Sequence, residues 1–105
     1  MSKYHAVRTE VEGITFASRA EAARYSDLRL LERSGIITQL VCQPKFPLIV
    51  NGAKICTYIA DFSYLDQQAK LRIEDVKGVR TPLFSLKAKL FHALYKELRI
   101  TEITR

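Results

Sequence analysis

The sequence lacks a long apolar run, a signal peptide and any cluster of cysteines and histidines. No hydrophobic segment approaches the length that crosses a bilayer, so we expect a cytoplasmic protein with no membrane partner. Its two cysteines, Cys42 and Cys56, lie in apolar runs at a spacing that matches no zinc site. In a reducing compartment we interpret them as small core residues. We expect no small-molecule cofactor.

Acidic residues are outnumbered by basic ones, with 11 Asp and Glu against 17 Lys and Arg and a formal net charge of +6. A basic surface is compatible with a polyanionic partner, and equally with simple solubility. Several acids cluster at the candidate site described below, whereas bases lie on flanking segments: Lys3, Arg8, Arg80, Lys87, Lys89, Lys96 and Arg99. An acidic centre within a basic surround is typical of a metal-dependent enzyme that acts on a phosphodiester backbone.

The length of 105 residues and the periodicity predict one domain of mixed α/β (α+β) class over residues 1–105, with a mobile basic arm over 1–9. A short turn or hairpin is expected around Gly13. Helices are predicted over 18–34 and 83–98, and strands over 36–42, 46–50, 54–65, 71–78 and 99–104. The order α-β-β-β-β-α-β with short connections predicts a mixed sheet flanked by helices.

Glu21 lies in the first turn of the first predicted helix. Ser18 is a good N-cap residue, and Glu21 three positions later completes a capping box, which is one reading of this acid. The helical period also places Glu21 on the apolar stripe of Tyr25 and Leu28, where a capping box does not need it. The second reading is that Glu21 points toward the sheet and takes part in a site.

Two aspartates face each other in the hairpin closed by the turn 66–70. If Leu65 pairs with Leu71, then Asp61 lies opposite Asp75, with Cβ atoms about 5 Å apart. Like charges at such positions destabilise a sheet, and a divalent cation between the carboxylates would remove the conflict. A solvated sheet face and a buried pair that shares one proton remain alternatives.

Two lysines follow from the same reasoning. Lys77 lies on the face of Asp75 and can place its ammonium against a phosphate or a nucleophilic water. Lys87 falls in the middle of the apolar stripe of the second helix, which predicts either a phosphate contact or a lysine whose stem lies along the core edge. Gln43, before Pro44, either contacts substrate or closes the end of the sheet.

Asp61 and the run Asp75-Val76-Lys77 resemble the D…(D/E)xK signature of the PD-(D/E)XK nuclease superfamily, with Ala60 in place of the usual proline. Five ordered segments resemble a phage-encoded family of small proteins placed in that superfamily, which includes Holliday junction resolvases. The segments are Gly-Ile-Thr-Phe-x-Ser-x-x-Glu-Ala at 13–22, Gln-Pro-Lys-Phe at 43–46, Tyr-Ile-Ala-Asp-Phe at 58–62, Glu-Asp-Val-Lys-Gly at 74–78 and Leu-Lys-x-Lys-Leu-Phe at 86–91.

The resemblance implies a restriction-endonuclease-like αβββαβ core and DNA cleavage that depends on Mg²⁺, for which Mn²⁺ can substitute. It implies that Asp61, Asp75 and Glu21 ligate the metal, Glu21 directly or through water, together with the backbone carbonyl of Val76. Lys77 would be the catalytic lysine. Lys87, Gln43, Lys89, Arg80, Lys3 and Arg8 are the residues expected to contact DNA. A phage origin would place the protein in the cytoplasm of the bacterial host.

These observations leave three functions open. The first is an endonuclease selective for branched or Holliday junction DNA, in phage recombination or replication, which reads shape and backbone and would form a homodimer to make paired cuts. The second is a DNA-binding recombination-accessory protein that keeps the fold and does not cleave. The third, a sequence-specific restriction-type nuclease, is disfavoured because the chain has no added recognition domain.

Overall fold

The computed structural model describes residues 7–104, which form two helices and eight strands in mixed α+β order. The elements are β1 (Thr9–Val11), β2 (Ile14–Phe16), α1 (Arg19–Arg33), β3 (Thr38–Cys42), β4 (Lys45–Val50), β5 (Ala53–Ile59), β6 (Phe62–Leu65), β7 (Leu71–Val76), α2 (Pro82–Leu94) and β8 (Ile100–Ile103). Within these residues, no helix has the length and apolar character needed to cross a membrane.

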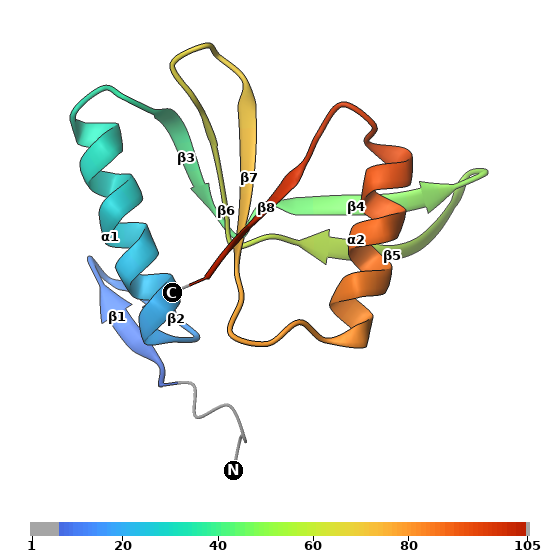
Figure 1. Cartoon of the computed structure of the whole chain (residues 1–105), viewed down its shortest axis with the longest axis horizontal. Coiled ribbons are helices and arrows are strands. Elements are labelled where there is room, and N and C mark those ends of the chain that lie inside the picture. The colour runs from blue at the N-terminus through green and yellow to red at the C-terminus, as the bar shows by residue number, and fades with distance from the viewer. Residues whose placement is uncertain (1–6, 105) are drawn as a thin grey trace.

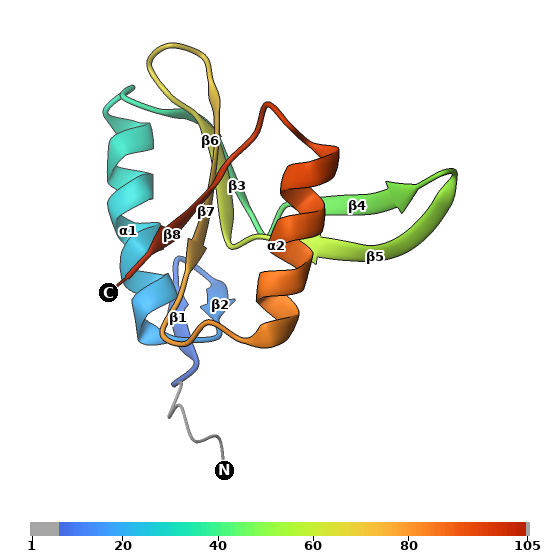
Figure 2. The ribbon, with the colours of Figure 1, turned by 45° about the vertical axis from the view of Figure 1, so that its right-hand side comes forward.

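A four-stranded sheet in the order β3-β6-β7-β8 lies between the two helices (Figure 1). β6 is antiparallel to both of its neighbours, β3 and β7, and β8 runs parallel to β7, so the sheet is mixed as the sequence predicts. Read along the chain, α1, β3, β6, β7, α2 and β8 give the expected αβββαβ order. The β4–β5 pair is inserted between β3 and β6 and projects away from the sheet (Figure 2).

The two faces of the sheet carry separate cores because side chains of a strand alternate between faces. On one face, Val76 of β7 and Phe62 of β6 pack with Tyr25 and Leu28 of α1. On the other face, Ile73 of β7 packs with residues of α2 and the β4–β5 pair, among them Leu48, Tyr58, Phe84, Ala88 and Phe91. β7 is therefore covered on both sides.

The strand predicted over 54–65 is wrong in one respect: it is two strands, β5 and β6, separated by Ala60 and Asp61. The neighbouring segment of the same chain, Gln43 and Pro44 between β3 and β4, bends at the same place. Two hydrogen bonds carry the ladder through it, from Gln43 N–H to Asp61 O (2.9 Å) and from Ala60 N–H to Pro44 O (3.1 Å). Gln43 has a φ of 55°. The bend turns β5 out of the main sheet, so Ile59 pairs with Lys45 of β4.

Both helices begin where the sequence predicts. The Ser18 hydroxyl accepts the Glu21 N–H at 3.1 Å, and Thr81, one of two expected caps, accepts the Phe84 N–H at 3.1 Å. α2 ends at Leu94, earlier than the predicted residue 98, because the chain turns there. Leu83 at the start of α2 is 62% exposed, because Phe84, Ala88 and Phe91 form the buried stripe of this helix.

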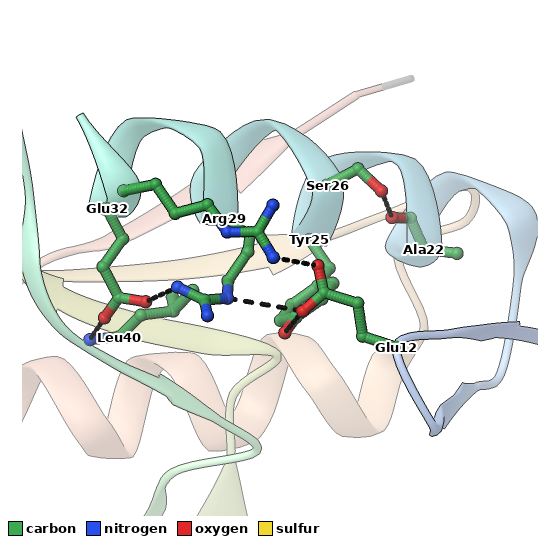
Figure 3. Close-up of polar contacts among 8 residues, drawn as sticks. Glu12, Ala22, Tyr25, Ser26, Arg29, Glu32 and Leu40 are labelled. Atoms are coloured by element: carbon green, nitrogen blue, oxygen red, sulfur yellow. Dashed lines mark hydrogen bonds and ion pairs between the residues drawn. The ribbon is translucent and has the colours of Figure 1, made fainter.

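The N-terminal hairpin β1–β2 and the strand β3 are fastened to α1 by one charge network (Figure 3). Glu12, in the β1–β2 turn, accepts hydrogen bonds from Arg29 (3.4 Å) and Arg33 (3.0 Å) of α1. Glu32 binds Arg29 at 2.9 Å and accepts the Leu40 N–H of β3 at 3.0 Å. These contacts hold the C-terminal half of α1.

A buried ion pair fastens α1 to β7 near the other end of the helix. Glu74 is 2% exposed, and its carboxylate accepts two hydrogen bonds from Arg24, each 2.6 Å long, and a third from the Tyr64 hydroxyl. Such a bidentate pair fixes both distance and direction between the two elements. It lies one helical turn from Glu21 and one residue from Asp75.

We predict that Glu74→Gln lowers the free energy of unfolding by about 3 kcal/mol, because it leaves the charge of Arg24 without its buried partner. Glu102→Gln is the matched control, since Glu102 pairs with Arg80 at the surface and that change should cost less than about 1 kcal/mol. Urea denaturation of the three proteins measures both values. Equal costs for the two variants would contradict the role given to the buried pair.

Candidate functional site

Asp61 and Asp75 meet where β6 begins and β7 ends. The pairing of β6 with β7 has the predicted register, from Leu65 with Leu71 to Phe62 with Glu74. The ladder stops there, but the Asp61 side chain continues the contact: one oxygen accepts the Val76 N–H at 2.7 Å, and the carboxyl lies close enough to that of Asp75 for the two charges to interact. The bend thus leaves the Asp61 carboxylate against β7.

Asp75 is held by Tyr58 of β5 and by Lys77, which directly follows β7. It is 3% exposed, and one carboxylate oxygen accepts the Tyr58 hydroxyl of β5. The other lies 2.7 Å from the ammonium of Lys77, which in turn lies 3.9 Å from the centre of the Phe84 ring of α2. A carboxylate with donors on both oxygens is fixed in orientation.

The electrostatics of the site favour uptake of positive charge. Burial raises the pKa of Asp61 to about 7, and the neighbouring charges of Asp75 and Glu21 add to the rise, while the Val76 N–H opposes it. Burial also raises the pKa of Glu21, and the charge of Asp75 adds to this rise. The backbone hydrogen bond from Ala17 and the charge of Lys77 lower the same pKa. The pKa of Tyr58 is raised by burial and by its bond to Asp75. A bound proton or cation would reduce the repulsion between these carboxylates.

The donor set suits a hard cation held by two carboxylates. Asp61 and Asp75 provide adjacent oxygens, and Mg²⁺ ordinarily takes one or two protein carboxylates and completes its shell with water and substrate phosphate. Among residues 7–104 no three His, Cys, Asp or Glu side chains are grouped closely enough to hold a metal together. Glu21 is half-buried and influences Asp75 and Lys77 through its charge, a position that suits contact through water rather than direct ligation.

A pocket of about 220 Å³ opens beside Asp75, between β5, the end of β7 and the start of α2. It is lined by Tyr58, Ile59, Asp75, Lys77, Thr81, Leu83, Phe84 and Lys87. Lys87 is half-buried, and its ammonium donates to the Thr57 carbonyl of β5 at 3.1 Å. The structure therefore brings Lys87 to the same pocket as Asp75 and Lys77.

The other residues expected to contact DNA lie outside this pocket. Gln43 is exposed, and its backbone N–H binds Asp61 O, so it closes the sheet at the bend. Arg80 is paired with Glu102 and bonds Ser85 at 3.0 Å. Lys89 is exposed on α2, and Arg8 is exposed before β1. Thr9, expected in the arm, begins β1, and Lys3 lies outside the described residues.

Tyr58 and Arg24 are two contributors that the sequence reasoning missed. In a continuous strand Tyr58 and Asp61 would point to opposite faces, and only the bend brings the Tyr58 hydroxyl to Asp75. A buried tyrosine needs a partner for its hydroxyl, which was an available signal. For Arg24 the available signal was Glu74, because an acid on a buried face indicates a cationic partner.

The whole chain, residues 1–105, matches the family described as "Protein of unknown function (DUF1064)". The chain belongs to DUF1064. No curated protein and no solved structure matches it. The family description carries no activity, so the chemistry of this DUF1064 member is argued from its own residues.

The carboxyl contact predicts a pH dependence of stability in metal-free protein. The carboxyl of Asp61 has a pKa of about 7 when folded and about 3.9 when unfolded, so between these values the folded state binds more protons. The free energy of unfolding therefore falls as pH rises through this window. Asp61→Asn stays neutral, so we predict that this variant gains stability relative to the wild type as the pH rises from about 4 to about 7, the limits of that window.

Chemical denaturation in EDTA at several pH values, with both proteins side by side, measures this difference and cancels the titration of the remaining groups. If the free energy of unfolding of the wild type instead rises relative to that of Asp61→Asn as pH rises, the charged form of Asp61 is the favoured one. That result would contradict the contact.

Proposed function

We propose that the protein is a Mg²⁺-dependent deoxyribonuclease of the PD-(D/E)XK type. The observation that carries this proposal is the contact between Asp61 and Asp75 with Lys77 beside them, at the edge of a pocket that also contains Lys87. The αβββαβ order and the five sequence segments support it. A protein that only binds DNA gains nothing from buried acids that face phosphates.

Each residue of the site would have its own role in cleavage of the phosphodiester bond. Asp61 and Asp75 would hold the cation, with the Val76 carbonyl beside them and Glu21 acting through water. When bound, Mg²⁺ supplies a Lewis acid and a water of lowered pKa. Tyr58 keeps the Asp75 carboxylate in orientation. Lys77 orients the attacking water or stabilises the negative charge that develops on the phosphoryl oxygens.

DNA would approach through the pocket side of the molecule. The ammonium of Lys87 has donors beyond its bond to Thr57 and can bind a phosphate next to the one that is cut. The net charge of +6 favours a polyanion over the whole surface. Few side chains are free for base contacts in a domain of this size, so the proposed substrate is branched DNA, including Holliday junctions, cut by a homodimer in the cytoplasm during phage recombination or replication.

The test is cleavage of labelled linear duplex, single-stranded DNA and a four-way junction, each with Mg²⁺, Mn²⁺ or EDTA. We predict cleavage only with metal and fastest on the junction. Asp75→Ala should lower the rate by at least about 100-fold, because transition-state stabilisation by the metal is lost.

Asp66→Asn is the matched control, since Asp66 lies in the turn at the far end of the same hairpin and should leave the rate unchanged. If the protein binds DNA but cleaves it under none of the metal conditions, it is a DNA-binding accessory protein and the enzyme function is overturned. Cleavage that survives Asp75→Ala would overturn the assignment of the site.

A further inference from the structure

We propose that the pocket beside Asp75 is a subsite for one unpaired nucleotide, whose phosphate meets Lys87 and Lys77 and whose sugar and base lie against Ile59 and Leu83. This inference rests on the proposed function and adds to it the part of the substrate that the protein selects. It makes Leu83 and Ile59 specificity-determining residues.

One wall of the pocket is built for an anion. The Lys77 ammonium is held between Asp75 and the Phe84 ring, and the Lys87 ammonium is held by the Thr57 carbonyl. Each ammonium has three donors, so both retain capacity for a phosphate oxygen. Thr81 adds a hydroxyl to the lining.

Two aliphatic side chains of the same lining are open to solvent. Ile59 is 50% exposed and Leu83 is 62% exposed, yet both line the same pocket as the two lysines. A phosphate alone would leave these side chains uncovered, and a purely apolar ligand would leave the ammonium groups without a counter-charge. A nucleotide satisfies both kinds of lining side chain, since its phosphate is anionic and the faces of its sugar and base are apolar.

The pocket favours an unpaired nucleotide over a paired one. A base within a duplex is stacked and can reach such a pocket only after it is turned out, which costs a few kcal/mol, whereas an unpaired base has little to lose. Gaps, flaps and overhangs supply such nucleotides, and a fully paired four-way junction supplies one when a base pair at its branch point opens. A preference for branched DNA then has a physical origin in this pocket.

α2 offers a matched pair of variants for the test. Leu83 and Leu86 are both exposed, at 62% and 64%, and lie one turn apart, but only Leu83 lines the pocket. Leu83→Ser and Leu86→Ser therefore remove the same surface group from inside and outside the proposed subsite. Ile59→Ser provides a second variant inside it.

The measurement is fluorescence anisotropy in Ca²⁺ with three labelled DNAs: a blunt duplex, the duplex with one unpaired thymidine, and the same duplex with an abasic residue at that position. Wild type should bind the thymidine DNA about tenfold more tightly than the other two, from the apolar surface that one base buries against Ile59 and Leu83. Leu83→Ser and Ile59→Ser should reduce that ratio about fivefold and leave blunt-duplex affinity unchanged. Leu86→Ser should keep the wild-type ratio.

Equal affinity of wild type for thymidine and abasic DNA would overturn the subsite, as would an equal loss of the ratio in Leu83→Ser and Leu86→Ser. If the wild type still cleaves DNA in Mg²⁺ under either outcome, only the subsite fails and the proposed function stands. Absence of both DNA binding and cleavage would overturn the two together.

Discussion

Two carboxylates held against each other at the end of β7 are the constraint on which the site depends. Asp61 is anchored by the Val76 N–H, and Asp75 by Tyr58 and Lys77, so neither can turn away to relieve repulsion. Burial adds to the cost of charge on Asp61. Structures keep such a conflict where a bound positive charge resolves it, and perturbed acids beside a pocket are characteristic of functional sites.

The rest of the fold supports this contact from both faces of β7. Alternate residues of the strand point in opposite directions, so Glu74 binds Arg24 of α1 while Asp75 binds Tyr58 of the projecting β4–β5 pair. The charge network of Glu12 and Glu32 fixes the far end of α1. The helix is thus held at two places, and Glu21 in its first turn is carried into the field of the site. One strand therefore links both helix layers to the chemistry.

The sequence was sufficient for the helix starts, the two hairpins and the β6–β7 register, because caps, turn residues and period-two alternation are local signals. It was not sufficient for the bend at Ala60 and Asp61. The ladder keeps its register through the bend, so no change of pattern marks it. Since the bend aims Tyr58 at Asp75, that contact could not be predicted either. The Arg24–Glu74 pair joins elements far apart in the chain, which local patterns do not reach.

We propose that Asp61 and Asp75 together bind a divalent cation. The most direct measurement is an anomalous difference map from crystals of the protein soaked in MnCl₂ at neutral pH. We expect one strong peak between the two carboxylates, bonded to an oxygen of each, with Glu21 reached through water. A map with no peak there, with the Lys77 ammonium still bound to Asp75, would contradict it.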